Sequence, residues 1–191
     1  MRKSMILTAM LVFIFVSVAW AAVHKLDKAV TIILPNNWQV ETYKVGERGD
    51  GKGTSMLLSG LLTKQGESAP SCGIAVGIGP NSPMITQERI SAMKQEDITA
   101  SSNEIQQGVS GAFGERGITV TDWRYGIEKV DGKSALHWTF TARQSLGEMY
   151  MEQYQIPTAD ALVNLNMWCR ADSKGDCLAA FSNAVGSLEL K

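Results

Sequence analysis

Alternation of hydrophobic and polar residues predicts β-strands along most of this chain. In the first half, four segments rich in apolar and β-branched residues are bounded by turn-forming residues, and they span 29–34, 39–45, 56–62 and 72–78. Pro35-Asn36-Asn37 separates the first two segments, and such short connections are typical of antiparallel neighbours. The segment 47–53 is polar and rich in glycine, so it predicts a loop.

The apolar residues adopt a helical spacing between residues 86 and 113. Thr86 is a suitable N-cap for this segment, and Glu88 lies in its first turn. Ser101-Ser102-Asn103 predicts a kink, or a break that divides the segment into two helices. The glycines between residues 108 and 117 predict its end.

The remaining chain predicts a meander of strands. These strands are expected at 118–130, 134–143, 148–156 and 161–171, with Asp131-Gly132 as the turn between the first two. Within 134–143, one side carries Leu136, Trp138 and Phe140, and the other carries Ala135, His137, Thr139 and Thr141. We therefore expect one face of this strand in the core and the other partly wet.

A closing helix is predicted from Lys174 to Leu188. Its apolar stripe consists of Leu178, Phe181, Val185 and Leu188. Ser173 and Asp176 occupy positions that resemble a capping box.

The N-terminus has the pattern of an export signal. Met1-Arg2-Lys3 is followed by an apolar segment, 5–18, and by Ala19-Trp20-Ala21, an A-x-A cleavage site. Because the apolar segment is shorter than the roughly 20 residues of a spanning helix, cleavage after Ala21 is favoured over retention as an anchor. We expect a signal peptide at 1–21 and a periplasmic or secreted single domain at 22–191. No cysteine lies near the cleavage site to carry a lipid, so we expect no stable membrane insertion after cleavage.

Charge excludes one class of partner. Loss of Arg2 and Lys3 leaves 16 basic residues against 19 acidic ones, and no basic stripe occurs in the sequence. Nucleic-acid binding needs such a stripe, so we predict no nucleic-acid partner.

Three cysteines raise the question of a disulfide, because exported proteins meet oxidising conditions. Cys169 and Cys177 predict a local bridge between the last strand and the first turn of the last helix, with Cys72 as a free thiol. The alternative pairs Cys72 with Cys169 across the sheet. Zinc binding and redox catalysis are disfavoured, because the pair lacks a second pair, a nearby histidine and the C-x-x-C spacing.

Residues that commonly carry catalysis form no convincing constellation. His24 is expected in a mobile tail after the cleavage site, and His137 on a polar strand face. No G-x-S-x-G nucleophile elbow occurs, and Gly77-Ile78-Gly79 lacks the third glycine of a dinucleotide site. Asp122, Glu128 and Asp131 do not share the register that a calcium cage requires. We predict no catalytic residue, no metal site and no cofactor.

Aromatic residues suggest a binding surface instead. Most of those in the second half are expected in the core. Tyr150 and Tyr154, however, share a strand face with Glu152, and aromatic residues beside polar ones are typical of interaction surfaces. We predict an interaction patch formed by His137, Tyr150, Glu152 and Tyr154.

Three motifs carry a family resemblance. Leu34-Pro35-x-x-Trp38, Val130-Asp131-Gly132-Lys133-Ser134-Ala135 and the segment 181–188 are similar to motifs of the PsbP/DcrB-like superfamily. The resemblance covers about residues 29–190 and implies an α+β fold. That fold is an α/β/α sandwich with a central, mainly antiparallel β-sheet and helices on both faces, which agrees with the strands and helices predicted above. The missing lipid-anchor cysteine is a departure from many bacterial members.

The resemblance also implies a non-catalytic binding or accessory protein that acts through a protein partner, with immunity and envelope assembly as possible roles. Two alternatives remain open. One is a periplasmic module that binds a small ligand or metal in a cleft formed with residues 47–53. The other, less favoured, is a hydrolase.

Overall fold

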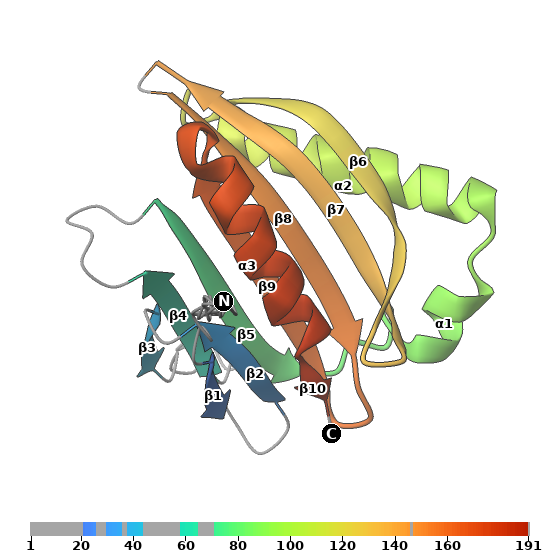
Figure 1. Ribbon diagram of the computed structural model, residues 1–191. Coiled ribbons are helices and arrows are strands. Elements are labelled where there is room, and N and C mark those ends of the chain that lie inside the picture. The colour runs from blue at the N-terminus through green and yellow to red at the C-terminus, as the bar shows by residue number, and fades with distance from the viewer. Residues whose placement is uncertain are drawn as a thin grey trace, which may run out of the picture.

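The computed structural model describes residues 21–25, 30–35, 38–43, 58–64, 71–145 and 147–190. Its centre is a seven-stranded sheet in which all neighbours are antiparallel, in the order β3-β4-β5-β9-β8-β7-β6 (Figure 1). In that order the strands span Trp38–Tyr43, Leu58–Lys64, Cys72–Pro80, Ala161–Arg170, Gly147–Pro157, Lys133–Gln144 and Thr119–Val130. A smaller sheet has the order β1-β2-β10 and spans Ala21–Lys25, Val30–Pro35 and Glu189–Leu190. Every strand that the sequence predicts is present.

Helices cover both faces of the large sheet (Figure 1). One face carries α1 (Gln87–Ala92) and α2 (Gln95–Gly114). The other carries α3 (Lys174–Gly186), which follows a short 3-10 turn, η1 (Ala171–Ser173). The predicted α/β/α sandwich is therefore confirmed. Among the helices of the described residues, none has the length and apolar character needed to cross a membrane.

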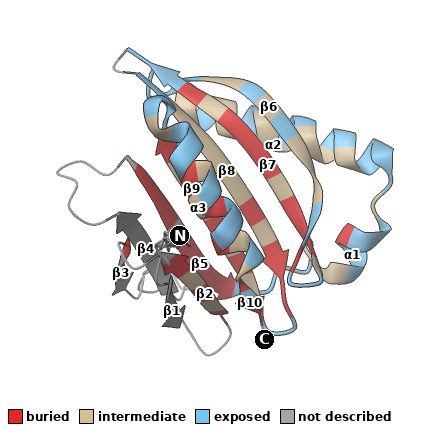
Figure 2. Ribbon diagram, viewed as in Figure 1, coloured by how far each residue is buried: buried red, intermediate tan, exposed pale blue. Residues whose placement is uncertain are grey.

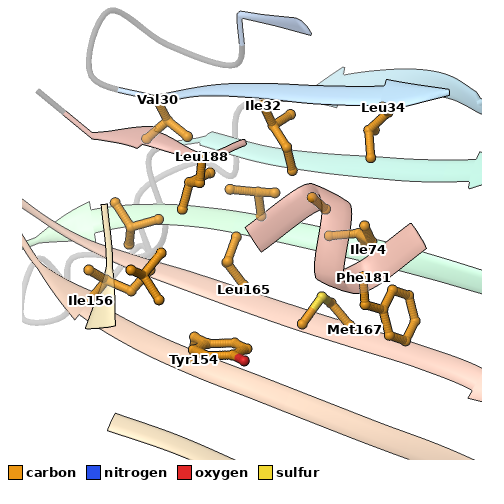
Figure 3. Close-up of a cluster of buried hydrophobic side chains, with 14 of the residues drawn as sticks. Val30, Ile32, Leu34, Ile74, Tyr154, Ile156, Leu165, Met167, Phe181 and Leu188 are labelled. Atoms are coloured by element: carbon orange, nitrogen blue, oxygen red, sulfur yellow. The ribbon is translucent and has the colours of Figure 1, made fainter. Parts of the chain in front are cut away.

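The larger core lies between α3, β2 and the strands β5, β9 and β8 (Figure 3). The large sheet contributes Ile74, Leu165 and Met167, and β2 contributes Ile32. Phe181 of α3 is 1% exposed and packs among them. Each fully buried side chain of this kind stabilises the fold by about 1.5–3 kcal/mol relative to exposure, so this cluster fixes α3 on the sheet.

A second core lies under α1 and α2. Its centre is Phe140 of β7, which is 0% exposed, with Leu136 and Trp138 beside it. The predicted buried face of this strand is confirmed. On the face expected to be partly wet, His137 and Thr141 are half-buried, but Thr139 is buried and Ala135 packs in the larger core. None of the 20 described residues of α2 is fully buried, so this layer is held less tightly than α3 (Figure 2).

The β6–β7 hairpin sets the register of the sheet's edge. Asp131 and Gly132 have φ angles of 48° and 72°, the left-handed conformation that a two-residue type I′ turn requires. Counting from this turn places Gly126 opposite His137. Further along β6 the register shifts between Thr121 and Arg124, and such bulges discourage pairing with another chain.

The predicted break of the long helical segment lies at the wrong place. Thr86 caps α1 as predicted, because its hydroxyl accepts from the Arg89 N–H at 3.2 Å. The chain leaves the helix at residues 93–94, where the Asp97 carboxylate accepts the Lys94 N–H at 2.9 Å and starts α2. Ser102 continues inside α2, with its hydroxyl accepting from the Trp123 indole at 3.0 Å. The helix thus continues through the predicted kink, and the Ser102 side chain has a polar partner on β6.

The closing helix differs in detail from its prediction. Its buried stripe is centred on Cys177, Phe181 and Ala184, with Leu178 and Val185 packed at the margin. Ala184 is small, so the helix can approach the sheet along this line. The predicted capping bond of Ser173 is not formed, because its hydroxyl donates to Asp172 at 3.2 Å.

Two expectations concern the N-terminal third. His24, expected in a mobile tail, lies instead in β1, where its backbone pairs opposite Ile32. The predicted loop at 47–53, and with it the proposed small-ligand cleft, lies outside the described residues.

Candidate functional site

Polar side chains gather on the part of the sheet beside α3. There α3 lies over β9, while β6 and β7 extend beyond it (Figure 1). We call the α3-side surface of β6, β7 and β8 the β6–β8 face. The pairing of β7 with β8 sets His137 opposite Tyr154, and residues two positions further along both strands share the same side. The four residues of the predicted patch therefore lie together on one face, while their role in binding stays a prediction.

The centre of the face is the imidazole of His137, whose side chain is 16% exposed. Its Nδ1 lies 2.9 Å from Glu128 Oε1, and its Nε2 lies 3.2 Å from Glu152 Oε1. A neutral imidazole has a single N–H and can donate to one carboxylate only, whereas the protonated ring donates to both. Each ring nitrogen thus faces a carboxylate oxygen. We call these groups, with Tyr150 and Tyr154, the His137 cluster.

Two tyrosines complete the His137 cluster. The Tyr154 hydroxyl lies 3.0 Å from Glu152 Oε1 and 3.2 Å from Glu128 Oε2. Its ring stacks on the imidazole with centroids 4.2 Å apart. The Tyr150 hydroxyl donates to the other Glu152 oxygen at 3.4 Å, and the Lys174 ammonium lies 4.1 Å from the centroid of its ring. Glu152 thus has partners at both oxygens, and its side chain is only 13% exposed.

The protonation states follow from burial and these contacts. Burial raises the pKa of Glu152, but hydrogen bonds with His137 and Tyr154 outweigh it, so the pKa lies below its usual 4.5. Burial, reinforced by the charge of Glu152, raises the pKa of Tyr150 to about 12. Burial and the two carboxylates also raise the pKa of Tyr154 above its usual 10. Near neutral pH, Glu152 is charged and both tyrosines keep their protons.

The lowered pKa of Glu152 predicts a loss of stability in acid. A carboxyl whose folded-state pKa is depressed stabilises the fold above its unfolded pKa and loses this contribution as the pH falls through the folded one. We expect the free energy of unfolding, measured by urea titration, to fall more steeply below about pH 4.5 in the wild type than in Glu152→Gln. Glu148→Gln is the control, because Glu148 is on the same strand with its side chain 44% exposed. Equal slopes for wild type and Glu152→Gln would refute the prediction.

The structure separates the groups that nucleophilic catalysis would need to combine. Cys72 lies on β5 and His137 on β7, with β9 and β8 between them. At about 4.8 Å between neighbouring strands, that separation exceeds hydrogen-bonding distance several-fold. Among the described residues, no group of three or more His, Cys, Asp and Glu side chains is arranged to hold a metal ion. The His137 cluster is a group of charged and hydrogen-bonding side chains held close together on the sheet surface.

Glu128 is the one member of the His137 cluster that the sequence analysis did not select. It was considered only as a metal ligand, with Asp122 and Asp131. A register count from the Asp131-Gly132 turn gives the missing signal, because Glu128 pairs opposite Ala135 and lies diagonal to His137. Its side chain is 50% exposed, so it is the carboxylate of the cluster that an external molecule can reach.

The three cysteines lie together beneath α3. Cys72 and Cys169 are directly opposite each other on β5 and β9, and Cys177 of α3 interacts with both thiols. All three are buried free thiols in the structure. The predicted bridge between Cys169 and Cys177 is thus not formed in it, and the pairing stays a prediction. The shared position of the thiols adds Cys72–Cys177 to the two pairings considered from the sequence.

Burial also governs the reactivity of these thiols. It raises the pKa of Cys169 to about 11, and it raises that of Cys177 as well, with the Cys72 thiol adding to the effect. Because the thiolate is the nucleophile, these two thiols are poorly reactive at neutral pH. They suit a structural role better than catalysis.

Comparisons with known proteins identify the fold. No protein-family model matches the chain, and no curated protein matches it. Among solved structures, cyanobacterial PsbP (CyanoP) from Synechocystis superposes with a TM-score of 0.58 at 13% identity, over 93% of this chain and 96% of CyanoP. The chain has the PsbP/DcrB-like fold. The sequence resemblance to this superfamily is thereby confirmed at the level of fold.

A second solved structure shares the PsbP/DcrB-like fold. LpqN of Mycobacterium tuberculosis, described as involved in cell envelope biogenesis, superposes with a TM-score of 0.51 at 11% identity. The match covers 90% of this chain and 91% of LpqN. The LpqN match thus agrees with the CyanoP match at the level of fold.

Proposed function

We propose that this protein is an exported, non-catalytic accessory protein that binds a protein partner through the β6–β8 face. The observation that carries the proposal is the His137 cluster, in which two carboxylates, an imidazole and two tyrosines are fixed on a sheet surface. Side chains that are already ordered lose little conformational entropy when a partner binds. Tyrosine is also enriched among the residues that dominate binding energy.

The charge of the His137 cluster favours a partner with a basic side chain. Glu152 is enclosed by its neighbours, whereas Glu128 is half-exposed. An arginine or lysine of the partner would meet Glu128 beside the stacked rings of His137 and Tyr154. Charged groups arranged in this way chiefly determine the specificity and rate of association.

The fold supports an accessory role in the cell envelope. CyanoP and LpqN share the architecture, and LpqN is described as involved in cell envelope biogenesis. An envelope-assembly role for the present chain is the narrower form of the proposal and depends on export. Export predicts a mature N-terminus at Ala22, which N-terminal sequencing of the envelope fraction can test separately.

Site-specific crosslinking tests the binding face. A photo-crosslinking amino acid at Arg124, exposed on β6 and paired opposite Thr139, is expected to capture a defined partner in the cells of origin. The same group at Gln107, exposed on α2, should not capture it. Capture from position 107 alone would refute the proposed face.

A charge reversal then tests the contact itself. Glu128→Lys should lower the crosslinking yield from position 124 at least severalfold, because it sets like charges against each other. Glu115→Lys makes the same change at an exposed residue just beyond α2 and should leave the yield unchanged. Equal yields in the two variants would remove Glu128 from the contact.

A further inference from the structure

A cavity of about 770 Å³ lies between the α1–α2 layer and the sheet, on the face opposite to the His137 cluster. Its apolar wall comes from both helices and from β7, and includes Ile90, Met93, Ile105 and Leu136. The volume lies within the range of ligand-binding pockets, which is roughly 300–1,000 Å³. Because α2 buries none of its described residues fully, the packing leaves room here that a bound molecule could fill.

Two hydrogen-bond donors at this cavity have no partner. Among the described residues, only the Tyr125 hydroxyl and the Trp138 Nε1 are buried side-chain nitrogen or oxygen atoms without a hydrogen bond. Trp138 is 6% exposed, and both residues line the cavity. They are directly opposite each other on β6 and β7, with ring centroids 6.3 Å apart. A buried unpaired donor costs about 1–3 kcal/mol, so two adjacent ones point to a missing acceptor.

A neighbouring tryptophan shows the usual solution. The indole N–H of Trp123, also on β6, donates to Ser102 Oγ at 3.0 Å. Burial raises the pKa of Tyr125, and the nearby Ser101 hydroxyl acts to lower it. The Tyr125 and Ser101 hydroxyls do not, however, have the geometry of a hydrogen bond. The donors of Tyr125 and Trp138 are thus exceptions on a sheet face where a similar group is satisfied.

Charges around the cavity determine what kind of molecule fits. Arg89, Asp97 and Glu104 contribute one positive and two negative charges to the lining. One Asp97 oxygen already accepts the Lys94 N–H, and the Arg89 guanidinium lies 3.5 Å from Met84 Sδ. The net charge of these three residues is negative, so an anionic ligand is disfavoured.

We propose that this cavity binds an uncharged, mainly apolar small molecule whose carbonyl oxygen accepts hydrogen bonds from Tyr125 and Trp138. A carbonyl oxygen has two lone pairs and can accept from both donors at once. The hydrocarbon part of the molecule would lie against Ile90, Met93 and Ile105. This site is independent of the protein contact proposed above, because it lies on the other face of the sheet.

The test uses two naphthalene probes that differ in the acceptor. Prodan carries a ketone and fluoresces at shorter wavelength in apolar surroundings, and 2-(dimethylamino)naphthalene lacks the ketone. With purified protein we expect saturable binding of both probes and tighter binding of Prodan. Trp138→Phe and Tyr125→Phe should each weaken Prodan binding about three- to tenfold, the value of one hydrogen bond, and leave the ketone-free probe unaffected.

Matched variants control for nonspecific effects. Trp123→Phe removes an indole N–H on β6 that already donates to Ser102. Tyr150→Phe removes a tyrosine hydroxyl on the opposite face of the sheet. Neither should change Prodan binding, and thermal unfolding verifies that every variant is folded. The proposal is overturned if Prodan does not bind saturably, if both probes bind the wild type equally, or if both donor variants bind Prodan as the wild type does.

Discussion

Replacing Phe140 by alanine is expected to lower the free energy of unfolding by about 3–5 kcal/mol. The ring is 0% exposed at the centre of β7. It meets Phe113 of α2 edge-on at 5.5 Å between centroids and stacks on Trp123 at 5.8 Å. Removal of this ring leaves a cavity at the centre of the core beneath the α1–α2 layer. Urea unfolding followed by circular dichroism measures the loss.

Phe113→Ala is the matched control for this prediction. It deletes the same side chain from the other partner of the edge-on pair, but Phe113 is only partly buried. The loss should therefore be smaller, about 1–2 kcal/mol, since less apolar area is removed from water. If Phe140→Ala costs no more than Phe113→Ala, β7 is not the anchor of the α1–α2 layer.

Local patterns predicted the strands and helices, and the family resemblance implied their arrangement as a sandwich. The alternation in 134–143 gave the correct sides for Phe140 and His137, because a strand in a two-sided sheet must segregate its side chains by face. The Asp131-Gly132 pair gave the tight turn, because its conformation needs residues that tolerate positive φ. Both are signals within a few residues, and neither depends on distant partners.

Features that depend on distant partners were missed. Ser102 remains helical because it accepts a bond from Trp123, 21 positions away in the sequence. The short β10, Glu189–Leu190, pairs with β2 near the other end of the chain. The cavity arises from how α1 and α2 lie on the sheet, so no spacing of residues indicates it. The predicted patch contains every member of the His137 cluster except Glu128, because residues that share a strand face can be recognised from their spacing.

Removing the imidazole is expected to reveal how the His137 cluster is held together. His137→Ala removes one of the two partners of Glu152 Oε1 and leaves only the Tyr154 hydroxyl. The Glu152 side chain is 13% exposed, so water replaces the lost partner poorly. A poorly solvated charge that loses its partner is costly, so we expect a loss of about 2–4 kcal/mol at neutral pH. The loss should be smaller near pH 4, where Glu152 in this variant takes up a proton more readily. Urea titrations at both pH values measure the difference.

A double variant separates this loss from the loss of side-chain packing. His137→Ala combined with Glu152→Gln removes the buried charge along with its partner, so it should recover about 1–2 kcal/mol relative to His137→Ala. Thr139→Ala, on the same face of β7, should show no such dependence on pH, because its partner Tyr150 keeps its proton at both pH values. A loss for His137→Ala that is equal at both pH values, with no recovery in the double variant, would assign His137 a packing role only.

The same variants divide the His137 cluster into an inner and an outer part. Glu152 fixes the imidazole from within, whereas Glu128 is half-exposed, and an ion pair of an exposed carboxylate usually contributes only about 0–1 kcal/mol. Glu128→Gln should therefore leave the unfolding curve almost unchanged and still weaken capture of the partner from position 124. A fall in stability that accompanies the loss of capture would instead mean that the cluster acts on binding only by maintaining the fold.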